Sequence, residues 1–143
     1  MKVLLEELVV VADEEFQLIK ITNKIREKVA ESEINEGIVH VITEHTTTGI
    51  TVNESLPCVE RDILGRLDSI FPDDYPYEHN HYLPSYGTIG ANAPGHLKSL
   101  ITGNHCVFPI VAGQLKLGHA ADIYFAEYDG IKKRKIMIHM MGV

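Results

Sequence analysis

The first half of this chain alternates between segments with strand periodicity and segments with helical periodicity. Residues 3–11 are apolar and rich in β-branched side chains, and residues 16–21 alternate between two faces, so both are predicted to be strands. Further strands are predicted over residues 38–43 and 46–52.

Helical spacing separates these strands. Ile25 and Val29 recur four residues apart and predict an amphipathic helix that ends near Asn35. Pro57 suits the first turn of a second helix. The apolar face of this helix consists of Val59, Ile63, Leu67 and Ile70. A third, short helix is predicted over residues 96–101.

Two β-hairpins are predicted in the last third of the chain. Residues 107–117 turn at Ala112-Gly113, and residues 123–140 turn at Asp129-Gly130. Residues 72–95 are rich in proline and glycine and show no period, and irregular stretches of this length are usually functional or disordered. Because the strands come in hairpins, the pattern favours a mainly antiparallel α+β fold over a doubly wound parallel sheet.

The composition is that of one globular domain, predicted to span residues 1–143. Hydrophobic residues make up 45% and charged residues 23%, which excludes the disordered and collagen-like classes. The formal charge of -7 disfavours nucleic acid as a partner. The one basic run, residues 132–135, is predicted to be the exposed start of a strand rather than a nucleic-acid patch.

No membrane or export segment is predicted. Glu6-Glu7 interrupts the N-terminal apolar run, and residues 99–115, the longest stretch without a charged side chain, contain glycine, asparagine and proline. Cys58 and Cys106 belong to no CxxC pair, so neither a disulfide framework nor a thiolate zinc site is indicated. We expect a cytoplasmic protein with two inert thiols.

The densest polar cluster within a strand pattern is EHTTTGITVNE at residues 44–54. Alternation places Glu54 on one face of this strand. The other face carries His45, Thr47, Gly49, Thr51 and Asn53. Such a face has little reason to be core, so it is either a binding site or a half-exposed strand with a ladder of hydroxyl groups.

Histidines also occur in and just after the irregular stretch, at His79, His81 and His96. Three imidazoles and a water form a common catalytic zinc geometry, but the spacings match no compact zinc signature. A surface or satisfied core position explains any single histidine more simply. We assign His40, His105, His119 and His139 to that class.

The start of the third helix is a candidate anion site. Backbone N–H groups at NAPGHLK, residues 92–98, together with the helix dipole and Lys98, can hold a phosphate. A capped helix with a surface lysine explains the same residues. Similarly, Arg61 and Asp62 place charges one turn into the second helix, and a surface salt bridge explains them equally well.

Several blocks taken together are similar to one protein family. They read HTTTGITVNE (45–54), YEHN (77–80), NAPGHLKSLITG (92–103), and GQLKLG (113–118) followed by IYFAEYDG (123–130). The chain resembles, in order and over nearly its whole length, the YjbQ family, also called the secondary thiamine-phosphate synthase family. The resemblance implies a small sandwich-like α+β subunit that assembles as a homotrimer, with the site near a subunit boundary. It also implies the joining of hydroxymethylpyrimidine diphosphate to a thiazole phosphate, giving thiamine phosphate.

The resemblance also implies roles for individual residues. It makes His45, His79 and His96 candidate ligands of a divalent metal, zinc or magnesium. Lys98, with the start of its helix, would bind the phosphate or diphosphate, and Glu54 would transfer a proton. The candidate substrate-binding residues are Thr46, Thr47, Asn53, Arg61 and Asn92.

Three positions depart from the family pattern. Members often carry Gly-Asp shortly before the asparagine, where this chain has Ile89-Gly90-Ala91-Asn92 and lacks the carboxylate. A Trp-Gln pair commonly follows GQLKLG, where Ala120-Ala121 stand here, and this loss can open the pocket or change its ligand. Ile131 replaces a proline and affects only the turn.

Two other functions fit the same residues. The departures suit a non-catalytic trimer that binds a small phosphorylated ligand at its subunit boundaries. Three imidazoles with an open water position also suit a metal-dependent hydrolase. A hydrolase would release phosphate from generic esters, whereas a synthase requires two substrates.

Overall fold

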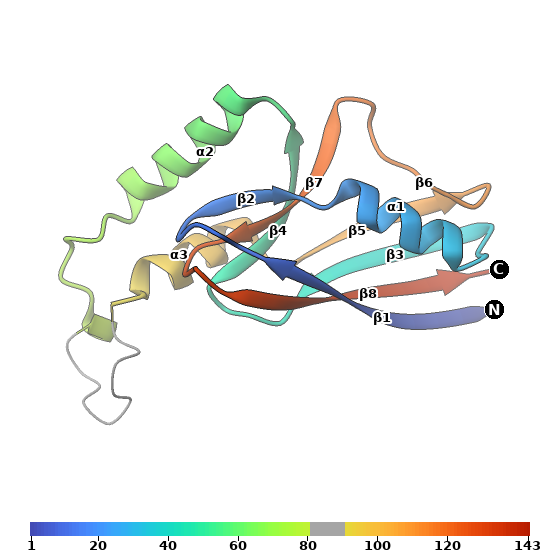
Figure 1. The fold of residues 1–143 in the computed structure, drawn as a ribbon, viewed down its shortest axis with the longest axis horizontal. Coiled ribbons are helices and arrows are strands. Elements are labelled where there is room, and N and C mark those ends of the chain that lie inside the picture. The colour runs from blue at the N-terminus through green and yellow to red at the C-terminus, as the bar shows by residue number, and fades with distance from the viewer. Residues whose placement is uncertain (81–90) are drawn as a thin grey trace.

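The computed structural model describes residues 1–80 and 91–143. Within these residues the chain forms eight strands, three α-helices and one short 3-10 turn (Figure 1). The strands are β1 (Lys2–Val11), β2 (Gln17–Lys20), β3 (Glu36–Thr43), β4 (Thr48–Glu54), β5 (His105–Val111), β6 (Gln114–Leu115), β7 (Ala121–Glu127) and β8 (Lys133–Gly142). The helices are α1 (Thr22–Glu31), α2 (Pro57–Ile70) and α3 (Ala93–Thr102), and the 3-10 turn is η1 (Glu78–Asn80).

The strands form two antiparallel sheets. The larger sheet has the order β1-β8-β3-β5-β6, and the smaller has the order β2-β7-β4. Every strand pair in the described part of the chain is antiparallel. The prediction of a mainly antiparallel, single-domain α+β fold is therefore confirmed.

One of the two predicted hairpins is wrong. Strands β5 and β6 pair as expected around Ala112-Gly113. Strands β7 and β8, however, lie in different sheets, so the Asp129-Gly130 turn is a corner between layers. Turn residues mark a change of chain direction, and they do not distinguish a hairpin from a corner between two packed sheets.

The main core lies between the two sheets, and α1 closes it on one side. Ile25 and Val29 of α1 are 0% exposed, and they pack with the inner-facing residues of both sheets. A second, smaller cluster on the other face of the smaller sheet joins Leu67 of α2 to Ala126 and Tyr128. Burying an apolar side chain of this size stabilises a fold by about 1.5–3 kcal/mol.

Three corners between the sheets meet at one end of the sandwich. The β1–β2 corner is joined to the β7–β8 corner by hydrogen bonds from the Ala12 N–H to the Lys132 carbonyl (3.1 Å) and from the Gly130 N–H to the Glu15 carbonyl (3.0 Å). The β3–β4 corner joins them through the Tyr128 N–H and the Thr47 carbonyl (3.0 Å). Side chains carried by these corners are consequently held by more than one segment.

Helix α3 packs against the outer face of β4 at the same end. A Cβ added to Gly49 would lie 2.4 Å from the Thr102 Cγ2, so only glycine allows the helix to approach this closely. The Ser99 hydroxyl donates to the Thr48 carbonyl at 2.6 Å. The helix is longer than the predicted 96–101, and β4 begins two residues later than predicted.

Most of the predicted irregular stretch, 72–95, contains little regular structure in its described residues. The turn η1 lies within it, α3 starts at its end, and residues 81–90 lie outside the described residues. In the part of the chain that the structure describes, no helix is long and apolar enough to cross a membrane.

Candidate functional site

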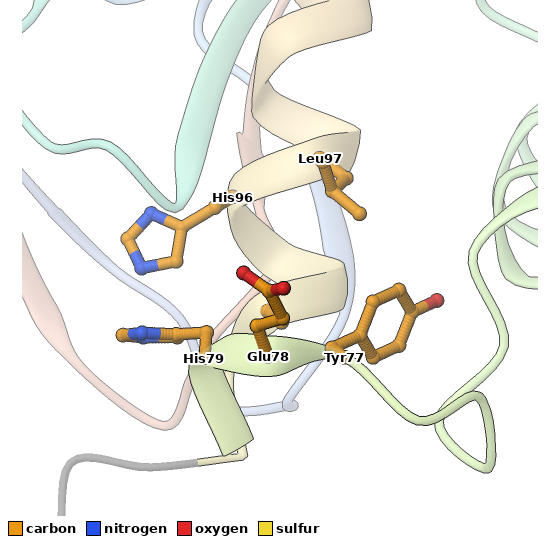
Figure 2. Close-up of a pocket in the computed structure, with 6 residues that line it drawn as sticks. Tyr77, Glu78, His79, His96 and Leu97 are labelled. Carbon is orange, nitrogen blue, oxygen red and sulfur yellow. The ribbon is translucent and has the colours of Figure 1, made fainter. Parts of the chain in front are cut away.

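A pocket of about 450 Å³ opens between η1 and the first turns of α3 (Figure 2). We call it the Tyr77 pocket. It is lined by Tyr77, Glu78, His79, Ala93, His96 and Leu97. Rings and aliphatic groups make most of its wall, and the Glu78 carboxylate is its one acidic group. Such a pocket suits a flat aromatic ligand that carries a hydrogen-bond donor.

A second pocket, of about 290 Å³, lies beside the β3–β4 corner. We call it the His45 pocket. It is lined by Thr43, Glu44, His45, Thr46, His96, Ser99, Leu100 and Asn104. Its lining includes the Glu44 carboxylate, and the Ser99 and Thr43 hydroxyls are already hydrogen-bonded to Thr48. The Thr46 hydroxyl and the Asn104 amide also line it, and groups of this kind can donate hydrogen bonds to a phosphate ester. His96 belongs to both pockets and therefore separates two adjacent cavities.

The three candidate histidines are not arranged as one ligand set. The rings of His79 and His96 meet edge to face, with centroids 5.2 Å apart. The Nε2 of His45 instead accepts the Lys135 backbone N–H at 3.4 Å, beyond the last pair of β3 with β8. Within residues 1–80 and 91–143, no group of three or more His, Cys, Asp or Glu side chains is placed to hold a metal ion. The predicted three-histidine metal site is thus not assembled by these residues of one chain.

A chain of polar contacts runs behind His79. The His79 Nε2 lies 2.8 Å from the Asn92 Oδ1, and the Asn92 Nδ2 donates to the Asp129 Oδ2 at 3.0 Å. The Lys132 ammonium donates to the same Asp129 oxygen at 2.8 Å. Asn92 was predicted to bind substrate, whereas here its amide connects His79 with the β7–β8 corner.

A buried ion pair lies beneath the corners. The Arg134 guanidinium donates from Nε and Nη2 to both carboxylate oxygens of Glu127, each at 2.8 Å, and Glu127 is 0% exposed. The same Nη2 donates to the Thr47 hydroxyl at 3.0 Å. Thr47 is buried and occupied by this contact, whereas Thr46, the other threonine predicted to bind substrate, is exposed and lines the His45 pocket.

Lys98 does not face either pocket. Its side chain is buried, its ammonium is paired with Asp68 of α2, and its Nζ lies 3.7 Å from the centre of the Phe16 ring. Lys98 is thus paired within the chain in this structure, and its role as an anion-binding group stays a prediction. The helical period turns it to the side of α3 that faces α2, where it joins the two helices.

Asn53, Glu54 and Arg61 lie away from the histidines. Strand β4 carries six residue steps between Thr48 and Glu54, which corresponds to about 20 Å. Asn53 and Glu54 are exposed, and the Asn53 Oδ1 accepts the Glu54 N–H at 2.9 Å. Arg61 lines a separate pocket of about 220 Å³ with Glu14, Gln17, Leu18, Pro57, Glu60 and Leu64. Asn53 and Glu54 thus lie at the far end of β4 from the two pockets, whereas Arg61 lies beside the β1–β2 corner in neither of them.

Two tyrosines near the pockets, Tyr77 and Tyr128, have a raised pKa. Burial, together with Asp73, raises the pKa of Tyr77, whose hydroxyl donates to the Pro72 carbonyl at 2.8 Å. Burial also raises the pKa of Tyr128, whose hydroxyl lies 2.6 Å from that of Thr102. Both phenols are therefore neutral near pH 7.

Sequence reasoning missed several residues at this end. Tyr77 and Glu78 were part of a quoted block, but no role was predicted for them. Arg134 was counted in an exposed basic run, whereas only Lys132, Lys133 and Lys135 are exposed. Period-two alternation along β8 was a signal that could have identified Arg134 as inward-facing.

Comparisons with known proteins agree over the whole chain. The family model described as UPF0047 protein YjbQ-like matches residues 6–143. A UPF0047 protein of Methanothermobacter thermautotrophicus is 32% identical over 142 residues, covering 99% of this chain and 94% of that protein. The UPF0047 protein YugU of Bacillus subtilis is 35% identical over 127 residues, covering 88% of this chain and 90% of that protein.

Solved structures share the fold as well as the sequence. A YbjQ-like protein of unknown function from Sulfolobus solfataricus superposes with a TM-score of 0.91 at 29% identity, covering 99% of both chains. An uncharacterized conserved protein of the yjbq/upf0047 family from Clostridium acetobutylicum gives a TM-score of 0.86 at 36% identity, covering 95% of this chain and 99% of that one.

Proposed function

We propose a two-substrate transferase function for this chain, which belongs to the YjbQ-like UPF0047 protein family. In this proposal the chain joins hydroxymethylpyrimidine diphosphate to a thiazole phosphate. The thiazole nitrogen forms a bond to the methylene carbon of the pyrimidine, and diphosphate leaves with the electron pair of the broken C–O bond. The product is thiamine phosphate.

The observation that supports this proposal is the pair of cavities that share His96. A coupling reaction requires two adjacent subsites, whereas a simple hydrolase requires only one. The rings of the Tyr77 pocket suit a pyrimidine, and the Glu78 carboxylate can accept a hydrogen bond from its exocyclic amine. The donors of the His45 pocket suit the phosphate of the second substrate.

Zinc or magnesium remains a separate prediction. His79 and His96 are the two adjacent imidazoles, but the residues described here do not supply a third ligand to them. Elemental mass spectrometry of chelator-free protein, with His96→Ala in parallel, tests the metal prediction directly.

We also propose that the chain acts as a homotrimer with a site shared between neighbouring copies. Glu54 and Asn53 lie about 20 Å along β4 from the pockets, so within one chain they do not reach them. The outer face of the larger sheet exposes apolar side chains, including Val3, Leu5 and Val107, and apolar faces of this kind commonly bind another protein. A head-to-tail ring would bring the two ends of different copies together.

The transferase proposal is tested by supplying both substrates and measuring thiamine phosphate and diphosphate. We expect product in the wild type and a loss of about 100-fold in His96→Ala, the range of a positioned proton-transferring or binding group. His119→Ala is the matched control, because His119 is exposed and lines neither pocket. Full activity of His96→Ala would contradict the proposal. Binding without turnover would favour the non-catalytic alternative, and phosphate release from one ester alone would favour the hydrolase.

The shared site is tested by complementation. His96→Ala and Glu54→Ala copies are co-expressed, so that random assembly gives mixed trimers. If each site takes His96 from one copy and Glu54 from the next, about a quarter of the sites are intact and activity recovers to that level. Two inactive variants that stay inactive together would contradict a shared site.

A further inference from the structure

The hydrogen bonds behind His79 show which group in each pair donates and which accepts. The Asp129 Oδ2 receives hydrogen bonds from the Lys132 ammonium at 2.8 Å and from the Asn92 side chain at 3.0 Å. An ammonium group can only donate, so this oxygen acts as an acceptor. The Asn92 amide therefore presents its NH2 group to Asp129 and its carbonyl oxygen to His79.

That orientation of Asn92 determines which ring nitrogen of a neutral His79 carries the hydrogen. A carbonyl oxygen accepts and does not donate, so the His79 nitrogen 2.8 Å away must carry the hydrogen. In a neutral imidazole only one ring nitrogen is protonated, so Nε2 is the donor and the lone pair lies on Nδ1. The hydrogen bonds thus fix the tautomer and not only the ring position.

Asp129 is itself held in place. Its backbone N–H donates to the Glu127 Oε2 at 3.1 Å, and Glu127 is paired with Arg134 in the buried cluster. On the other side, Ala91 adopts a φ of 79°, a left-handed conformation that places Asn92 at the start of α3. The orientation of Asn92 therefore depends on the β7–β8 corner rather than on the helix that Asn92 precedes.

His45, which lines the adjacent pocket, is held in the other tautomer. Its Nε2 accepts the Lys135 backbone N–H, so a neutral His45 carries its hydrogen on Nδ1. Two histidines that line adjacent pockets are consequently set in different tautomers by different backbone and side-chain partners.

We propose that Asp129 is a positioning residue that acts through Asn92 to hold His79 as the Nε2–H tautomer, so that Nδ1 is the nitrogen that His79 offers to a ligand in the Tyr77 pocket. The tautomer follows from the hydrogen bonds alone, whereas its use in binding rests on the proposed function. Asp129 lies 50 positions from His79 along the chain, so the fold and not the local sequence joins the two side chains.

Nitrogen NMR of the imidazoles tests this proposal without any ligand. At about pH 8.5, where ordinary imidazole side chains are neutral, the two ring nitrogens of each tautomer have distinct chemical shifts. We expect a single Nε2–H tautomer for His79 in the wild type. In Asp129→Ala the Asn92 amide loses its acceptor and can turn over, so the His79 shifts should move toward a mixture of the two tautomers.

Lys132→Met is the matched control, because it removes the ion pair with Asp129 and leaves the contact with Asn92. We expect its His79 shifts to remain those of the wild type. An Nδ1–H tautomer in the wild type, or unchanged shifts in Asp129→Ala, would overturn the proposal. Failure of the transferase proposal would appear only in the coupling assay and would leave these shifts as they are.

Discussion

The two ends of strand β4 differ in how firmly their polar groups are held. At its first residues, which we call the pocket end, three corners, the Arg134–Glu127 pair and the start of α3 hold Asn92 and, through it, His79. At its last residues, the Glu54 end, Asn53 and Glu54 are exposed. Helix α3 packs closely against β4, whereas α2 buries only Leu67.

This difference separates two ways of building a site. A binding group must be held in one geometry, and buried, fully paired polar networks provide that. Exposed groups are instead free to meet a second surface, as the shared site requires of Glu54. The comparison predicts that substitutions at the pocket end cost more stability than equivalent substitutions elsewhere.

The largest effect is expected from breaking the buried ion pair. Arg134→Met leaves the Glu127 carboxylate, which is 0% exposed, without its cation, so we expect the free energy of unfolding to fall by about 3–5 kcal/mol. Urea denaturation measures this loss. The neighbouring variant Lys135→Met is the control, because its ion pair with Glu7 is exposed and should change stability by less than about 0.5 kcal/mol.

A double substitution tests whether the unpaired charge causes that loss of stability. Glu127→Met combined with Arg134→Met removes both charges, so it should be less destabilising than Arg134→Met alone. A double variant as unstable as the single one would show that lost packing, and not the unpaired charge, causes the effect.

A smaller loss is expected where α3 meets β4. Gly49→Ala places a Cβ 2.4 Å from the Thr102 Cγ2 and 3.0 Å from the Gly103 carbonyl oxygen, so the helix must shift. Overpacking of this kind costs about 1–3 kcal/mol. Because α3 carries His96, coupling activity should fall with stability. Unchanged stability would mean that α3 is less firmly seated than this contact indicates.

Strand β7 carries a part-buried polar contact, opposite the middle of β4, that depends on pH. Burial and the hydrogen bond to Glu60 raise the pKa of Tyr124 to about 12, and its hydroxyl donates to the Glu60 Oε2 at 2.6 Å. Because the pKa is raised in the folded state, this contribution is fully present below about pH 10 and is lost as the pH rises through about 12.

Tyr124→Phe should therefore lower the free energy of unfolding by about 1 kcal/mol near pH 8. The difference from the wild type should shrink as the pH approaches 12. Urea denaturation at several alkaline pH values measures both effects, with the exposed Tyr75→Phe as the control. A difference that stays constant up to the highest pH would contradict the assigned role of this contact.

The sequence predicted the strands and helices better than it predicted how the turns connect them. Local periodicity predicted most strands and the amphipathic faces around Ile25 and Leu67, because those patterns depend on burial of one side of an element. The Asp129-Gly130 corner was misassigned, since residues 129–130 encode a change of direction and their pairing partners lie far along the chain.

The sequence identified only some of the residues that form the candidate site. Sequence blocks identified His79, His96 and Asn92, which the structure brings together. They could not show that Lys98 turns toward Asp68, or that Arg134 turns inward, because both depend on which helix or sheet covers the residue. The length of β4 also separates Glu54 from His45, with which it shares a sequence block.

The smallest expected effect has the opposite sign and concerns α2. Gly65 lies in the interior of this helix, and a Cβ added to it would meet nothing within 4 Å. Gly65→Ala should thus raise the free energy of unfolding by about 0.5–1 kcal/mol, because alanine loses less backbone entropy in a helix. Gly49→Ala, the same substitution at the pocket end, should destabilise the protein. Because the residue change is identical, the difference between the two variants reports the effect of the surrounding atoms. A loss of stability in Gly65→Ala that grows with protein concentration would show that another copy covers this side of α2, and that the helix is open only within a single chain.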